Sequence, residues 1–133
     1  MYGRHLLIDF YGCTFQNLDD RPLIERTLLT AAEKANATIL NHFFHQFSPQ
    51  GVSGAVIIAE SHISIHTWPE KGYAALDLFT CGDTMSPETA IEVLKDVFQP
   101  SHTQIRDYER GRIEHADMEI RPEINSSRDM RDR

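Results

Sequence analysis

A short alternating run, residues 61–68 (SHISIHTW), limits the fold of this chain more than any other stretch. Side chains on an extended chain point alternately to its two faces. His62, Ser64 and His66 therefore share one face, and the two isoleucines between them share the other. The run predicts a β-strand that packs one face on the core and carries imidazole and hydroxyl groups on the opposite face.

Runs of β-branched and aromatic residues predict that this strand has neighbours. A helix is expected at residues 21–36, because Asp20 can cap it and Pro22 suits its first turn. Ser86 and Pro87 begin a second helix in the same way. The apolar stripes of the two helices are Ile24, Leu28, Ala31 and Ala35, and Ile91, Leu94 and Phe98. The strands are expected at residues 5–11, 38–47, 55–59, 62–68, 73–80 and 102–108.

The order strand, helix, several strands, helix, strand predicts an α+β fold. Short turns between the strands favour antiparallel pairing, so the economical architecture is a two-layer sandwich, with an antiparallel sheet and two helices on one face. We expect residues 1–111 to form this single domain. Residues 112–133 are charged and contain few large apolar side chains, which predicts a mobile C-terminal tail.

The net charge of −7, from 13 basic and 20 acidic residues, argues against nucleic acid or an anionic membrane as a partner and mildly favours a cationic substrate. Cys13 and Cys81 lie far apart, without the spacing of a disulfide framework. The N-terminal apolar run is too short for a signal peptide or a membrane span. We therefore expect a cytoplasmic protein.

Several motifs surround the alternating run. They are Glu60-Ser61, His66, Trp68-Pro69-Glu70 and Phe79-Thr80-Cys81-Gly82. Together with FSPQGVSG at residues 47–54, they make the chain resemble the prokaryotic S-adenosylmethionine decarboxylase family from about Gly3 to about Gly111. Members of this family cleave themselves to make a pyruvoyl cofactor. The resemblance also implies that two processed protomers pair as a homodimer.

The resemblance implies self-cleavage between Glu60 and Ser61. The Ser61 hydroxyl would attack the preceding carbonyl, and elimination and hydrolysis would leave a pyruvoyl group at position 61. Ser53 is the implied hydrogen-bond donor and His66 the implied base of this processing. The two fragments, the β and α chains, are expected to stay associated.

The covalently bound pyruvoyl group derived from Ser61 is the implied cofactor, in place of pyridoxal phosphate. Its ketone can form a Schiff base with a substrate amine and accept electrons as carbon dioxide leaves. By the same resemblance Cys81 is the proton donor in decarboxylation, and a thiol with an ordinary pKa of about 8.5 holds a proton near neutral pH. Cys13 has no such context, and we expect it to be a buried apolar residue.

The resemblance assigns substrate binding to Phe47, Trp68 and Glu70. Aromatic rings can stack on a purine, and a carboxylate can accept hydrogen bonds from two ribose hydroxyls. The sequence departs from the family pattern at Gln46 and Lys71, and we expect both to alter the polarity at the mouth of the site.

These motifs predict a self-processing decarboxylase that converts a small molecule, S-adenosylmethionine, to its decarboxylated form for polyamine (spermidine) synthesis. Two alternatives stay open. One is a pyruvoyl-dependent decarboxylase of arginine or ornithine, and the other is a regulatory or binding homologue that never cleaves. No metal is expected, because His62 and His66 lie on a predicted strand and no complete set of ligands accompanies them.

Overall fold

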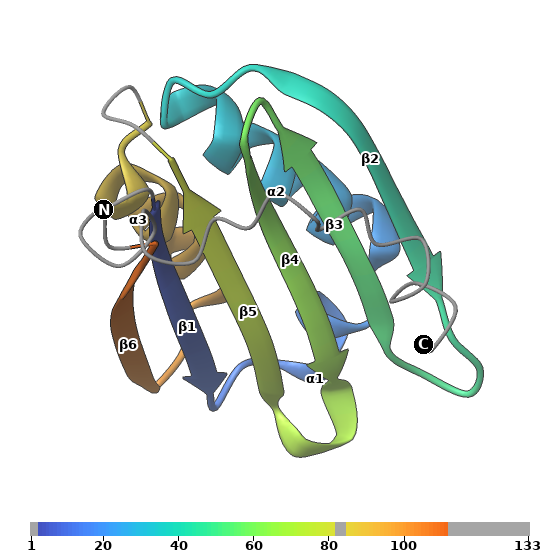
Figure 1. Cartoon of the computed structure of the whole chain (residues 1–133). Coiled ribbons are helices and arrows are strands. Elements are labelled where there is room, and N and C mark those ends of the chain that lie inside the picture. The colour runs from blue at the N-terminus through green and yellow to red at the C-terminus, as the bar shows by residue number, and fades with distance from the viewer. Residues whose placement is uncertain (1–2, 82–84, 112–133) are drawn as a thin grey trace, which may run out of the picture.

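Six strands form one antiparallel sheet with the helices on one face (Figure 1), as the sequence predicts. The computed structural model describes residues 3–81 and 85–111. The strand order across the sheet is β2-β3-β4-β5-β1-β6. In chain order the elements are β1 (Gly3–Tyr11), α1 (Phe15–Leu18), α2 (Arg21–Lys34), β2 (Ile39–Gln46), β3 (Val52–Ile58), β4 (Ser61–Trp68), the short 3-10 helix η1 (Pro69–Lys71), β5 (Tyr73–Thr80), α3 (Pro87–Phe98) and β6 (His102–Arg110).

The two long helices begin at side chains that cap them. Asp20 accepts a hydrogen bond from the backbone N–H of Leu23 at 3.0 Å, and Ser86 accepts one from Thr89 at 3.2 Å. These bonds satisfy N–H groups that have no partner within the first turn of a helix. The predicted apolar stripes of α2 and α3 are buried, so both helices pack on the same core.

The core lies between the helices and one face of the sheet. In β4, Ile63 and Ile65 are fully buried, whereas the side chains of His62, Ser64 and His66 point to the opposite face and stay partly or largely exposed. Full burial of an isoleucine side chain contributes about 1.5–3 kcal/mol to folding. The alternation predicted for this segment is therefore confirmed, and it orients the whole sheet.

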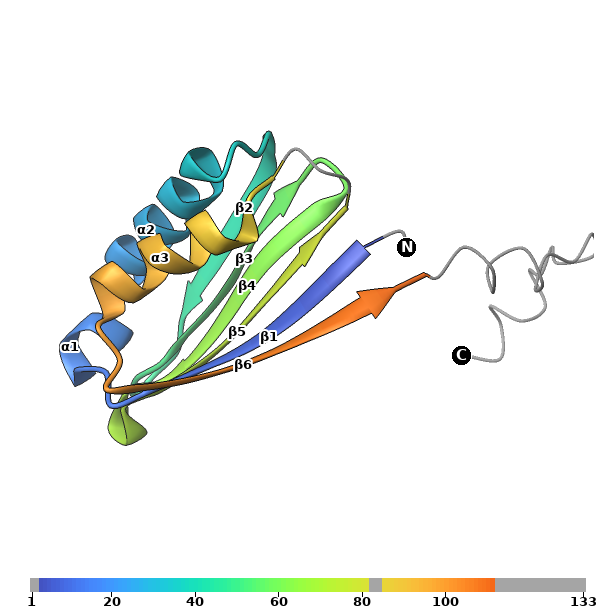
Figure 2. The same cartoon turned by 90° about the vertical axis from the view of Figure 1, so that its left-hand side faces the viewer.

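The sheet face opposite the helices, called the open face below, is covered by no described element of the chain (Figure 2). Large apolar side chains nevertheless lie on it. Leu7, Tyr11, Phe43, Ile57, Trp68 and Tyr108 are between 39% and 72% exposed. Extended apolar surfaces of this kind commonly mark an interaction site.

The sequence did not predict α1, because a helix of one turn is too short to show a periodic pattern. A buried threonine joins it to the sheet: Thr67 donates its hydroxyl to the carbonyl of Leu18 at 2.7 Å and accepts the N–H of Val52 at 2.9 Å. No helix among the described residues is long and apolar enough to cross a membrane. The predicted tail, 112–133, and Gly82 lie outside the described residues.

The packing of β2 on β3 predicts that Gly54 does not tolerate a side chain. Gly54 pairs with Phe44, whose ring lies 2.0 Å from the position that a Cβ would take. We expect Gly54→Ala to lower the free energy of unfolding by about 1–3 kcal/mol, because the buried Phe44 ring must move. Urea unfolding measures this. Ala55→Ser, the next residue and on the open face, is the control and should change it by less than about 0.5 kcal/mol.

Candidate active site

The expected site residues divide between the two ends of the sheet. At one end the β3–β4 turn carries Glu60 and Ser61, and β5 ends beside them at Cys81. At the other end β4 runs into η1, which places Trp68 and Glu70 together. Antiparallel pairing of β3, β4 and β5 produces this division, since each strand reverses the direction of the last.

The cleavage end contains strained backbone. Glu60 has a φ of +64°, a left-handed conformation that costs a residue with a side chain about 1–2 kcal/mol. It follows Ala59 in the two-residue turn between β3 and β4. The Oγ of Ser61 accepts a hydrogen bond from the backbone N–H of Cys81 at 3.2 Å. The expected nucleophile and the expected proton donor thus belong to one corner of the sheet.

Ser53 and His66 form a pair on neighbouring strands. They are register partners between β3 and β4, and Ser53 Oγ lies 2.7 Å from His66 Nδ1 in a hydrogen bond. Ser61 is five residues before His66 on the same strand, so their Cα atoms are about 16 Å apart. The structure thus brings Ser53 and His66 into contact with each other, but it does not bring them to Ser61 of the same chain.

The residues expected to bind substrate are accessible rather than part of the core. Phe47 is 46% exposed and Trp68 is 41% exposed. The Trp68 ring stacks on Tyr73 at a centroid distance of 5.3 Å, and Tyr73 stacks on Tyr11 at 5.3 Å, which forms an aromatic row across three strands. Glu70 is exposed, and its Oε1 accepts a hydrogen bond from Gln50 at 3.3 Å.

Gln46 forms its hydrogen bonds on the helix side of the sheet. Its amide donates to Asp19 Oδ1 at 2.8 Å and to the carbonyl of Gly51 at 3.1 Å, which joins the β2–β3 turn to the loop before α2. The side chain therefore lies on the helix side of the sheet and does not alter the polarity of the open face. Lys71 is exposed within η1.

The two cysteines differ as the sequence predicts. Cys13 is buried, with 7% of its surface exposed, and burial raises the pKa of its thiol. Cys81 is half-buried at the end of β5. Both are free thiols. Cys13 therefore serves as a buried, protonated packing residue. The side chain of Cys81, by contrast, is partly exposed to solvent.

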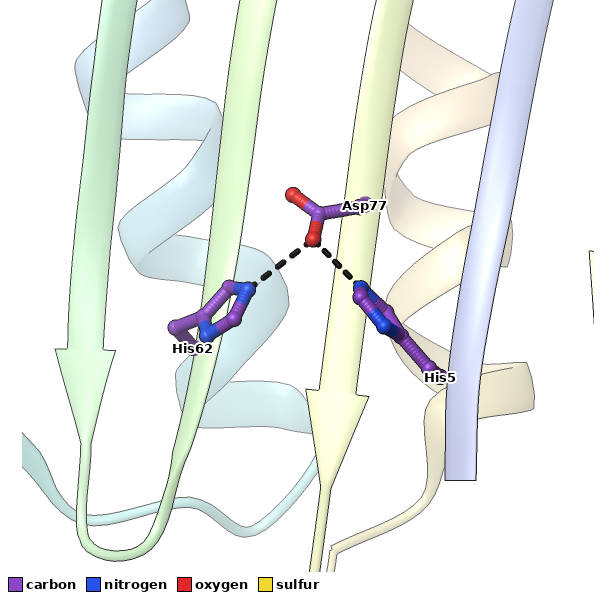
Figure 3. Close-up of side chains that lie close together, drawn as sticks. All are labelled: His5, His62 and Asp77. Carbon is purple, nitrogen blue, oxygen red and sulfur yellow. Dashed lines mark hydrogen bonds and ion pairs between the residues drawn. The ribbon is translucent and has the colours of Figure 1, made fainter. Parts of the chain in front are cut away.

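An Asp77-centred network lies between the two ends, and sequence reasoning missed it. Asp77 Oδ2 is 2.6 Å from His5 Nε2 and 3.0 Å from His62 Nε2 (Figure 3), and Ser64 donates to the other carboxylate oxygen. Burial alone would raise the pKa of Asp77, but the hydrogen bonds from Ser64, His62 and His5 together outweigh it, so the pKa is lowered. Asp77 is therefore held as a carboxylate.

The donor atoms of His5, His62 and Asp77 lie within 4.8 Å of one another, a grouping that can hold a metal ion. Arg110 Nη1 is 2.9 Å from His5 Nδ1, however. A guanidinium only donates, so this nitrogen must accept and the proton of neutral His5 resides on Nε2, facing Asp77. A proton at the coordinating atom and a cation beside the ring do not fit a metal site.

A hollow of about 310 Å³ opens beside this network. Its walls include Asp9 and Arg106 as well as Asp77, Ser64 and His66. Asp9 accepts a hydrogen bond from the Tyr73 hydroxyl at 2.6 Å and lies 3.8 Å from Arg106. The hollow thus joins the Asp77 network to the Ser53–His66 pair along the open face.

The model of the S-adenosylmethionine decarboxylase family matches residues 4–111. The S-adenosylmethionine decarboxylase proenzyme of Methanococcus maripaludis is 45% identical over 116 residues, 87% of this chain and 95% of that protein. The proenzyme of Parasynechococcus marenigrum is 49% identical over 110 residues, 83% and 86% of the two chains. The crystal structure of the adenosylmethionine decarboxylase from Aquifex aeolicus has a TM-score of 0.79 at 37% identity, over 84% of this chain and 92% of that one.

This chain belongs to the S-adenosylmethionine decarboxylase family. The family and fold expected from the sequence are confirmed, and the proenzyme names of the relatives agree with a chain that is made as a precursor. The family motif carried the signal for Ser61, Ser53 and His66. No comparable signal marked His5 or Asp77, which lie 72 residues apart and meet only through the pairing of β1 with β5.

In this decarboxylase-family chain, the aromatic row should have a measurable alkaline titration. Burial and then the hydrogen bond to Asp9 raise the pKa of Tyr73 from its ordinary value near 10 to about 12. The native state therefore retains the phenol proton longer than the unfolded state does, and this contribution to stability is lost as pH rises from about 10 to 12. Ultraviolet titration of Tyr73→Phe should lack this late phase, whereas Tyr108→Phe, the control, should keep it.

Proposed function

We propose that this chain cleaves itself between Glu60 and Ser61 and then decarboxylates S-adenosylmethionine, releasing carbon dioxide and decarboxylated S-adenosylmethionine, the aminopropyl donor for spermidine synthesis. One observation carries the proposal: the 3.2 Å hydrogen bond from the Cys81 N–H to Ser61 Oγ puts the cleavage residue beside the proton donor. Family membership supports it, since the relatives are S-adenosylmethionine decarboxylase proenzymes.

The backbone at Glu60 favours the cleavage step. Attack of Ser61 Oγ on the Glu60 carbonyl carbon forms an ester while the peptide C–N bond breaks. The left-handed strain at Glu60 exists only in the intact turn, so it is released when the chain is cut. Loss of the Cα proton of residue 61 then expels the Glu60 carboxylate, and water replaces the nitrogen as ammonia to leave a ketone at position 61.

The chain's own residues then fit the decarboxylation. A pyruvoyl group at position 61 supplies the electron sink for loss of carbon dioxide. Cys81 holds a proton at Sγ, and this proton takes the place of the departing carboxyl group on the substrate carbon. Phe47 and Trp68 offer exposed rings to an adenine, and Glu70 offers a carboxylate to the ribose hydroxyls. A reducing compartment, the cytoplasm, keeps the Cys81 thiol available.

Substitutions at the two central residues separate processing from turnover. Ser61→Ala should give a single uncut chain of about 15.2 kDa and no activity, because the nucleophile is gone. Cys81→Ala should be cut but release carbon dioxide from S-adenosylmethionine about 100-fold more slowly, since only the proton donor is lost. Denaturing mass spectrometry and a carbon dioxide assay measure the two.

Cys13→Ala, at the other free thiol, is the matched control and should keep full turnover. Full activity of Cys81→Ala would show that this thiol is not the donor. Carbon dioxide release from arginine or ornithine, with none from S-adenosylmethionine, would refute the proposed substrate.

We infer further that the active site is completed by a second copy of the chain. Ser61 and Cys81 lie at one end of the sheet, whereas His66 lies about 16 Å along the strand, toward the end that carries Trp68. A two-fold axis that lies between two packed open faces and runs across the strands places unlike ends side by side, with the same patch used on both copies. The exposed apolar side chains of the open face support this homodimer.

Shared sites predict complementation between two inactive chains. His66→Ala alone should stay uncut, since no copy supplies the base. Co-expressed with Ser61→Ala, the His66→Ala chain should be cut, because its Ser61 meets the partner's His66. The two chains carry different tags, so mass spectrometry shows which of them has been cut. An uncut His66→Ala chain in a purified mixed dimer would refute a shared site.

A further inference from the structure

The Asp77-centred network crosses four neighbouring strands of the open face. His62 on β4 and His5 on β1 both pair in register with Phe79 on β5, so the three rings form a row across the sheet. The His5 ring stacks on Phe79 at 5.4 Å, and His62 meets its edge at 5.9 Å. Asp77 and Arg110 complete the network from β5 and β6. The mechanism proposed above uses none of these residues.

The hydrogen bonds determine where the protons of both imidazoles lie. Arg110 donates to His5 Nδ1, so the Nε2 proton of His5 points to Asp77. A carboxylate only accepts, so His62 also directs an Nε2 proton to Asp77 Oδ2, at 3.0 Å. Of the four imidazole nitrogens in this network, Nδ1 of His62 is therefore the one that can accept a proton from outside the network.

Asp77 and Cys81 lie on opposite sides of the Phe79 row. Asp77 and Phe79 share the open face of β5, and Cys81 follows Phe79 by two residues, just beyond the end of the strand. His62 turns Nε2 to Asp77, and its second nitrogen lies on the opposite side of the ring (Figure 3). Diagonal neighbours on an antiparallel pair, such as His62 and Cys81, have Cα atoms about 7–8 Å apart, within reach of two side chains.

We propose that His62 is a further catalytic residue, which returns a proton to Cys81, and that Asp77 is the positioning residue that fixes its tautomer. The inference rests on the proposed role of Cys81. After the Sγ proton passes to the substrate carbon, Nδ1 of neutral His62 takes up a proton from solvent and passes it to the thiolate, which restores the thiol and leaves His62 as the Nε2–H tautomer. The titratable groups recorded against His62 are Asp77, which is hydrogen-bonded to it, and His5, whose ring centroid lies 6.0 Å away, and Arg110 contacts His5 in turn.

A double-mutant cycle tests the relay in the full-length protein. His62→Gln should still be cut between Glu60 and Ser61, but its decarboxylation should slow about 100-fold. If the residues act in series, His62→Gln combined with Cys81→Ala should be no slower than Cys81→Ala alone. Multiplied losses in the double variant, or full turnover in His62→Gln, would overturn the relay.

A spectroscopic measurement keeps the inference testable without turnover. Nitrogen-15 imidazole spectra of the uncut Ser61→Ala chain should show His62 as the Nε2–H tautomer. Asp77→Asn should mix the tautomers, and alkylation of Cys81 should shift the Nδ1 resonance of His62. His42 is the matched control, because its Nδ1 lies 2.7 Å from Glu25 on the helix side of the sheet.

The resonances of His42 should not respond to either change, and His42→Gln should keep full turnover. An Nδ1–H tautomer of His62 in the Ser61→Ala chain, or no response to alkylation, would overturn the relay. The proposed function fails separately, since it requires only that Cys81→Ala lose turnover.

Discussion

The alternation along β4 places isoleucines on one face of the sheet and imidazoles on the other. One face therefore packs on the core, and the other carries side chains of the candidate site. Ile63 and Ile65 bind the strand to the helices, so it cannot slip by one residue without exposing both. The same register fixes His62 beside Phe79 and His66 beside Ala75. Core packing therefore sets the positions of the side chains on the open face, although the core residues themselves lie on the opposite face.

The open face combines apolar side chains with charges that are already paired. Asp77 is held by His5 and His62, and Asp9 by Tyr73 and Arg106. A buried charge without a partner costs several kcal/mol, whereas a paired and hydrogen-bonded charge costs much less. On the described part of this surface the carboxylates of Asp77 and Asp9 are thus paired before anything covers them, as a surface that packs on a second sheet requires.

Local signals in the sequence predicted the local structure well. The capping residues Asp20 and Ser86 marked both long helices, and the period-two pattern marked the buried face of β4. The order of the strands was not predictable, because pairing β1 with β5 depends on packing between segments far apart in the chain. The contact of His5 with Asp77 depends on that pairing, so it could not be predicted from the sequence either.

The site was predicted as a set of residues and not as a geometry. The motif supplied Ser61 and His66, but a motif is a list along the chain and carries no strand direction. The structure adds that five extended residues separate them, about 16 Å, on one strand. The predicted strand over residues 61–68 already implies this distance along the chain, whereas the neighbours that the pairing brings to each end could not be predicted.

Under the proposed arrangement, the separation of Ser61 from His66 prevents an isolated precursor chain from cleaving itself. In a single chain the strained Glu60–Ser61 bond lies about 16 Å from His66, the proposed base, which is bonded to Ser53 farther along the sheet. Under the proposed arrangement, the second copy brings the base and covers the open face in the same step. Exclusion of water strengthens the hydrogen bonds around the reacting carbonyl. Cleavage is then coupled to assembly, and the strain at Glu60 is released only where a complete site can use the product.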